Sequence, residues 1–171
     1  MANTAVFCIA RSEEQAVRIV EDARDAGFTG NDLSVLFPDK EGTRDFAHER
    51  RTTAPEGATA GAVSGGVLGG IGGWLVGIGT LAIPGLGPFV AAGPIMAALG
   101  GVAAGAAAGG LTGGLIGIGI PEYEAKLYEG KVRGGNILIS VHTENSDEAK
   151  AAKEIMKRAG ADDIASSGEA A

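Results

Sequence analysis

The sequence predicts an α+β protein in which two charged arms form one domain and an uncharged, glycine-rich block is inserted between them. The 171-residue chain has 30 glycines, far above the usual ~7%, and 22 of them lie between residues 57 and 121. That span contains no Lys, Arg, Asp or Glu, whereas strand and helix patterns alternate in the flanking arms. We therefore divide the chain into residues 1–54, 55–120 and 121–171.

The first arm has the pattern of a strand, a helix and a second strand. The run TAVFCIA at residues 4–10 is short, apolar and rich in β-formers. Ser12 follows as a helix N-cap, and Gln15 three residues later completes a capping box. Gly27 stands where a helix C′ glycine is expected. The run DLSVLFPD at residues 32–39 then predicts the second strand, which a proline ends.

The second arm repeats this pattern after a helix predicted at residues 121–135. The run NILISVHT at residues 136–143 predicts a strand whose side chains alternate between two faces. Ser146 is expected to be the N-cap of the next helix, and Gly160 its C′ glycine. The run ADDIASS at residues 161–167 is expected to form a short last strand.

The two arms also resemble each other in sequence, which indicates two β-α-β units of one domain. SEEQAVRIVEDARDAGFTGNDLS and SDEAKAAKEIMKRAGADDIAS share the Ser cap, the acidic first turn and the Ala-Gly ending. Two such units predict a ferredoxin-like four-stranded sheet with helices on one face. The uncharged block is then an insertion between the halves of this domain.

The uncharged block is predicted to be a glycine-zipper helical hairpin. The run IPGLGP at residues 83–88 is the strongest turn pattern in the chain. One helix is expected at about residues 57–83 and the other from about residue 88 or 94 to residue 119. Glycines recur at multiples of four along both: Gly57, Gly61, Gly65, Gly69, Gly73 and Gly77, then Gly93, Gly101, Gly105, Gly109, Gly113 and Gly117.

This spacing has a physical meaning in helix packing. Small residues four apart lie on one helix face and let a second backbone approach closely. Because a helix has 3.6 residues per turn, such a row drifts around the cylinder, and one straight neighbour does not fill it. We therefore expect these twelve glycines to pack the two helices together and to form contacts between subunits of a homo-oligomer.

The hairpin is expected to be embedded in a membrane, with a soluble assembly as the alternative. Each helix is long enough to cross a ~30 Å hydrocarbon layer, and basic residues flank the block on both sides, as in a hairpin with both ends cytoplasmic. Trp74, however, lies in the middle of the first helix, and Gly and Ala fill most of its positions. The alternative is a soluble oligomer whose core holds the hairpins and encloses apolar cargo. A monomer would expose more apolar surface than monomers tolerate.

The arms carry no pattern of a catalytic, cofactor or metal site. No nucleotide-binding loop and no metal-ligand spacing is found, so no enzyme, cofactor or metal is predicted. Cys8 is the single cysteine and is expected to pack as a small apolar residue. His142 is expected to be a half-exposed residue of a strand. A net charge of −7, spread over both arms, argues against nucleic acid as a partner.

The chain resembles a known family in SEEQAVRIVEDARDAGFTGNDLSVLFPD and in its second arm, GIGIPEYEAKLYEGKVRGGNILISVH. It is similar to longer members of the bacterial heat-induced general stress protein (YflT-like) domain family, which carry a glycine-rich hairpin between these segments. The resemblance implies a non-enzymatic, stress-associated bacterial protein and supplies no active-site residues. It implies a location on the cytoplasmic side of the inner membrane or in the cytoplasm as a large assembly.

Overall fold

The computed structural model describes residues 4–38, 79–83, 87–95 and 103–168. Its helices and strands are, in chain order, β1 Thr4–Ala10, α1 Glu13–Asp25, β2 Leu33–Pro38, β3 Gly79–Ile83, β4 Gly87–Ala92, α5 Ala103–Gly117, α6 Glu122–Arg133, β5 Ile137–Thr143, α7 Ser146–Arg158 and β6 Asp162–Gly168. The strand, helix and strand predicted in the first arm are therefore present, and so are the strand, helix and strand predicted in the second arm. The helix predicted at residues 121–135 is present as α6.

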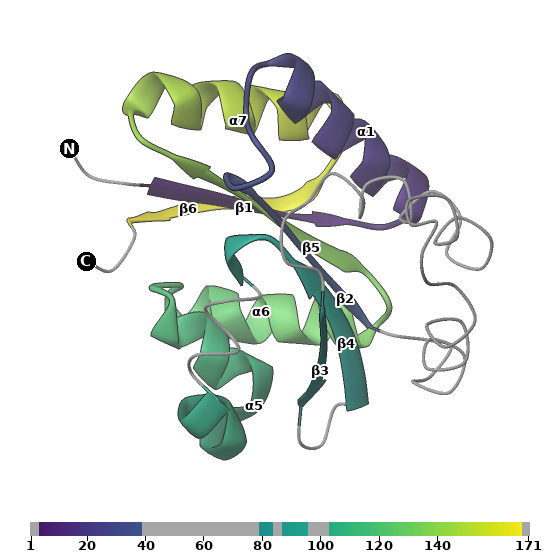
Figure 1. Cartoon of the computed structure of the whole chain (residues 1–171), viewed down its shortest axis with the longest axis vertical. Helices are drawn as coiled ribbons and strands as arrows, with labels where there is room; N and C mark the ends of the chain where they lie inside the picture. Colours follow the sequence, from purple (N-terminus) through teal and green to yellow (C-terminus); the bar gives the residue numbers. More distant parts are fainter. Residues whose placement is uncertain (1–3, 39–78, 84–86, 96–102, 169–171) are drawn as a thin grey trace, which may run out of the picture.

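The strands form one sheet in the order β3-β4-β2-β5-β1-β6, and every neighbouring pair is antiparallel. The four arm strands lie together as β2-β5-β1-β6, as the sequence predicts for the α+β class. The two further strands, β3 and β4, come from the uncharged block and continue the sheet beyond β2 (Figure 1). Sequence analysis did not predict these two strands.

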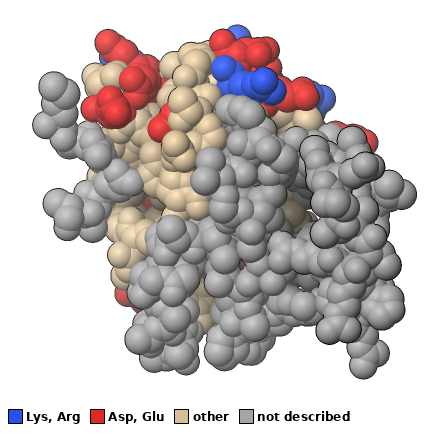
Figure 2. Space-filling view, in the orientation of Figure 1, with Lys and Arg blue, Asp and Glu red and all other residues tan. Residues whose placement is uncertain are grey.

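Helices α1 and α7 cover one face of the sheet (Figure 1). Their buried side chains, Ile19, Ile155 and Met156 among them, share a core with Cys8 and Ile139 from the central strands. Both helices are amphipathic, so their outer faces carry the charges that water solvates. Figure 2 shows charged side chains gathered along this side of the molecule.

The caps of these helices follow the sequence closely, with one correction. The Ser12 hydroxyl accepts a hydrogen bond from the Gln15 amide at 3.2 Å, as predicted. The second N-cap is Asn145, whose Oδ1 accepts from the amides of Asp147 and Glu148 at 3.1 and 2.9 Å. Ser146 is the first helical residue and was wrongly predicted as the cap, because Asn accepts these bonds as well as Ser does and stands one position earlier.

Helices α5 and α6 cover the opposite face, so the molecule has three layers (Figure 1). Leu111 and Leu115 of α5 and Tyr128 of α6 are fully buried against Phe7 and Leu138 of the sheet. The prediction of helices on one face alone was therefore wrong. The sequence does carry the reason, since β1 is apolar at every position but Thr4 and β5 has the apolar run Ile137, Leu138 and Ile139, as in strands that are buried on both sides.

Candidate functional site

The candidate site is the surface built by the uncharged block, because the block is the most unusual feature of the sequence. Within the described residues it supplies the β3–β4 hairpin, the start of a helix at Pro94 and Ile95, and α5. These segments pack against β2 at one edge of the sheet and against α6 on its second face. The block is thus built into the domain along part of its length.

The strands β3 and β4 correct the predicted boundaries of the two glycine-rich helices. Residues 79–83 were expected to end the first helix, and residues 88–92 were one of two expected starts of the second. Both segments are strands because β4 satisfies the backbone groups along the free edge of β2 and β3 pairs in turn with β4. The helical conformation begins at Pro94, which is the other start that was expected.

Gly93 joins β4 to this helical segment and has a role that the spacing of four did not indicate. Its φ is +82°, and a Cβ placed on it would lie 1.9 Å from the carbonyl oxygen of Leu33 in β2. The backbone therefore passes β2 at a distance that only glycine permits. Directly after it, the Ile95 amide donates a hydrogen bond of 3.0 Å to the buried hydroxyl of Ser34.

Helix α5 is broken at Gly110, where φ is 61° and ψ is −153°. This region of backbone conformation is open essentially to glycine alone. The first turn of the helical segment after the break receives hydrogen-bond acceptors from α6. The carboxylate of Glu129 accepts hydrogen bonds from the Thr112 amide, at 2.8 Å, and from the Thr112 hydroxyl. The negative charge of a carboxylate at a helix N-terminus also interacts favourably with the positive end of the helix dipole.

The outward side of α5 is unlike that of the other helices. Helix α5 contains no charged residue, and its composition is apolar all round, which is typical of a helix enclosed on every side. Ile116 is nevertheless 42% exposed in the single chain, and Tyr123 at the start of α6 is 80% exposed. These two side chains indicate an apolar surface that the described part of the chain leaves uncovered.

The twelve predicted packing glycines fall into three groups. The first six, from Gly57 to Gly77, and Gly101 of the second row lie outside the described residues. Gly93 lies beside β2, against the backbone of Leu33 and Ser34. Gly105, Gly109, Gly113 and Gly117 lie along α5, so the predicted helical spacing is realised there, but the break at Gly110 divides their row. Their role in contacts between subunits stays a prediction.

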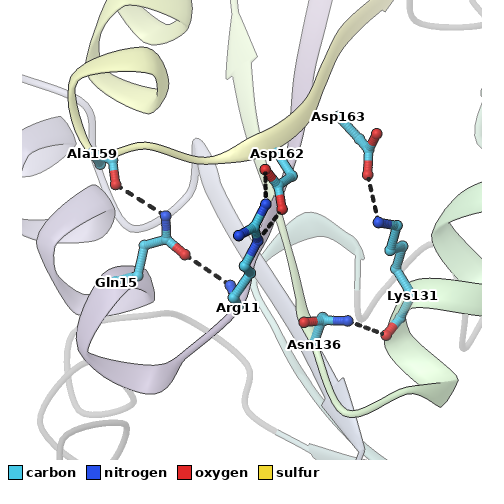
Figure 3. A network of polar contacts seen from close by, with 7 residues as sticks. All are labelled: Arg11, Gln15, Lys131, Asn136, Ala159, Asp162 and Asp163. Atoms are coloured by element: carbon cyan, nitrogen blue, oxygen red, sulfur yellow. Dashed lines mark hydrogen bonds and ion pairs between the residues drawn. The ribbon is translucent and has the colours of Figure 1, made fainter.

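A polar network links the two arms at the ends of β1 and β6 (Figure 3). The Arg11 guanidinium forms a bidentate pair with the Asp162 carboxylate, with one contact at 2.8 Å, and this pair lowers the pKa of Asp162. Gln15 accepts from the Arg11 amide and donates to the Ala159 carbonyl, at 2.8 and 3.0 Å. Lys131 reaches Asp163 at 3.5 Å. The network positions β6 and was not predicted from sequence, since its partners are far apart in the chain.

A shallow hollow of about 450 Å³ lies where α1 ends and α7 begins. His142, which is half-buried, shares its lining with Asp32, Glu144 and Glu148. The Asp32 carboxylate accepts from the Thr29 amide and hydroxyl, both at 2.8 Å. Glu148 accepts from the Glu144 amide and the Asn145 side chain. These carboxylates act as turn and helix caps, and in the described parts of the chain no group of His, Cys, Asp and Glu is placed to hold a metal ion.

Two reactive side chains in the core are held in their neutral forms. Cys8 is fully buried, and burial raises the pKa of its thiol to about 12. The thiol therefore stays protonated at neutral pH and packs as a small apolar group. Burial also raises the pKa of Tyr128, whose hydroxyl donates a 3.0 Å hydrogen bond to the Asp163 carbonyl. Neither group is prepared for nucleophilic chemistry.

Over residues 4–38, 79–83, 87–95 and 103–168, no helix has the length and apolarity needed to span a membrane. Comparisons of the chain with protein-family models, with curated proteins and with solved structures found no match.

Proposed function

We propose that this protein is a non-enzymatic, self-assembling protein in which an α+β domain is joined to copies of itself through its uncharged block. The observation that carries the proposal is a run of 65 residues without Lys, Arg, Asp or Glu in a chain of net charge −7. Part of that run packs on the domain, and α5 has no charged residue to place in water. An apolar surface of this kind is typical of contacts between subunits.

We also propose that the arms form a ferredoxin-like domain. Numbered among themselves, the arm strands have the order 2-3-1-4, and each helix links two strands that have another strand between them. Two interlocked β-α-β units of this kind support the assignment. In this assignment β3, β4, α5 and α6 are additions to that domain.

The sequence predicts a membrane-embedded hairpin with a soluble homo-oligomer as the alternative, and the β3–β4 hairpin supports the soluble homo-oligomer. A hairpin of two membrane helices over residues 57–119 would need β3 and β4 to leave the sheet, where β4 pairs with four residues of β2. In the proposed assembly the glycine rows pack protein against protein and enclose apolar cargo. A role in stress rests on the family resemblance alone.

The test is the mass of the full chain after extraction without detergent. The proposal expects particles of several times 17.0 kDa in the soluble fraction, measured by light scattering after size exclusion. Gly69→Leu is expected to reduce the mass of the particle. Gly70→Leu is a change of the same size at a glycine outside the row from Gly57 to Gly77, and it is expected to reduce the mass less. A monomer at all concentrations would overturn the proposal. Recovery in the membrane pellet alone would favour the membrane-embedded hairpin instead.

A further inference from the structure

The two edges of the sheet are built very differently, and the difference points to one of them as an interface. The β6 edge has an irregular register opposite Phe7 and Ile9, and Asp163 in it has a φ of 49°. Its residues are held by side chains from elsewhere: Lys153 donates to Ser166 at 2.8 Å, and Tyr128 to the Asp163 carbonyl. Irregularity and charge of this kind protect a strand edge from pairing with another chain.

The β3 edge has none of these protections in the part of the chain that the structure describes. Its sequence, GTLAI, has no charge and no proline. No described strand pairs with its outer side, since β3 ends the strand order and is bonded to β4. A regular, uncharged edge strand presents a row of unpaired N–H and C=O groups to any strand that fits beside it.

The prolines in the neighbouring strands identify which backbone groups of β3 point outward. Ala82 lies opposite Pro88, which has no N–H, so these two residues form a pair without mutual hydrogen bonds. Pro38 lies opposite Phe89 in the next ladder, so Phe89 directs its hydrogen bonds toward Leu81 of β3. Both observations assign the same pattern, in which Leu81 bonds to β4.

By the alternation of an antiparallel ladder, Thr80 and Ala82 then direct their N–H and C=O groups away from β4. A second β3 strand that runs antiparallel uses all four groups when Thr80 of one copy lies opposite Ala82 of the other. Leu81 then faces Leu81 of the second copy across a two-fold axis. The strand is equally uncharged in both copies, so this pairing brings no like charges together in an otherwise acidic protein.

We propose that two copies of this chain pair along β3 about a two-fold axis at Leu81, which joins their six-stranded sheets into one continuous sheet. This inference rests on the proposed self-assembly and names one surface through which it occurs. The same strand on both sides makes the contact isologous, which is the usual arrangement of a closed dimer.

The first test uses cross-linking of the full chain. Leu81→Cys is expected to form a disulfide-linked dimer under mild oxidation, because non-hydrogen-bonded antiparallel pairs place Cα atoms about 4.5 Å apart, within disulfide reach. Thr80→Cys is the matched control, since in this register the two copies of residue 80 are offset by two residues and lie about 7 to 8 Å apart. The wild-type chain supplies the blank, because its buried Cys8 is expected to stay unlinked. Equal cross-linking of the two variants would overturn the register.

The second test uses the mass of the particle. Ala82→Pro removes an outward N–H and leaves every β3–β4 hydrogen bond in place, so it is expected to reduce the mass about twofold. Ala82→Val keeps the N–H and is expected to retain the mass. Thr80→Pro repeats the test if Ala82→Pro loses the circular dichroism of the folded chain. Proline variants with the wild-type mass would overturn the β3 contact and leave self-assembly standing, whereas a monomeric wild-type chain would overturn both.

Discussion

The two faces of the sheet differ in that the second face is covered partly by an uncharged helix, α5, which has no counterpart on the first face. Helices α1 and α7 are amphipathic, have acidic residues in the first turn and at least one basic residue in the last turn, and have their own N-caps. Helix α5 has no charge, is broken at Gly110 and takes its cap from Glu129 of α6. Each helix of the first face is therefore capped by residues next to it in the sequence, whereas α5 on the second face is capped by a residue of another helix. Because the charged helix α6 supplies this cap, the uncharged α5 can pack as part of the charged domain.

The largest expected effect is at the point where the uncharged block passes β2. Gly93→Val introduces a side chain against the Leu33 carbonyl and forces a left-handed φ on a β-branched residue. We expect a loss of about 2 to 5 kcal/mol in the free energy of unfolding, measured by urea denaturation. Gly27→Ala is the control, since its φ of +99° is also left-handed but no atom lies within 4 Å. Equal losses in both variants would show that conformation alone, and not the close approach, accounts for the effect.

The next largest loss of stability is expected when a capping carboxylate is removed from one face of the sheet, in comparison with an exposed carboxylate on the other face. Glu129→Ala removes the acceptor for the Thr112 amide and hydroxyl, and is expected to cost about 2 kcal/mol. Glu154→Ala on α7 removes an exposed partner of Lys157 and is expected to change stability by less than about 0.5 kcal/mol. Hydrogen exchange is expected to accelerate at the Thr112 amide in the first variant. Unchanged exchange there would contradict the role of Glu129 as a cap.

A smaller effect tests the local caps of the first face. Asn145→Ala removes the acceptor for two amides of α7 and is expected to cost about 1 kcal/mol. Ser146→Ala, one residue later, is expected to leave stability within about 0.5 kcal/mol of the wild-type value, because residue 146 is already helical. The two thermal unfolding curves therefore separate the observed cap from the one that the sequence indicated. The reverse order of losses would restore Ser146 as the cap.

The smallest effect is expected at the network of Figure 3 and depends on pH. Arg11 lowers the pKa of the Asp162 carboxyl in the folded chain. The pair therefore contributes stability above the ordinary pKa of Asp, near 3.9, and loses it as the pH falls through the lower folded value. Asp162→Asn is expected to reduce this acid dependence slightly, because the Arg11 side chain is 72% exposed. Stability curves at pH 2 to 7 that stay parallel for both chains would contradict this contribution.

The parts of the fold that could be predicted are those with local causes. A capping box at Ser12 and a left-handed Gly27 act within one helix, so their effects can be recognised in adjacent residues. The strands β1 and β5 could be recognised by their apolar runs. The β3–β4 hairpin could not be distinguished from helix by glycine spacing, because the free edge of β2 determines its conformation. The same holds for Gly93, whose constraint comes from Leu33, sixty residues earlier.

By itself, the sequence determined the division into two charged arms and an uncharged block, the α+β class and most helix ends of the arms. Those features depend on composition, on hydrophobic periodicity and on caps a few residues away. Tertiary structure decided that the block adds strands to the sheet, that α5 covers a second face, and that Thr80 and Ala82 direct their backbone groups outward. These features arise from contacts between segments far apart in the chain, where one strand edge or one carbonyl determines the conformation that its neighbour adopts.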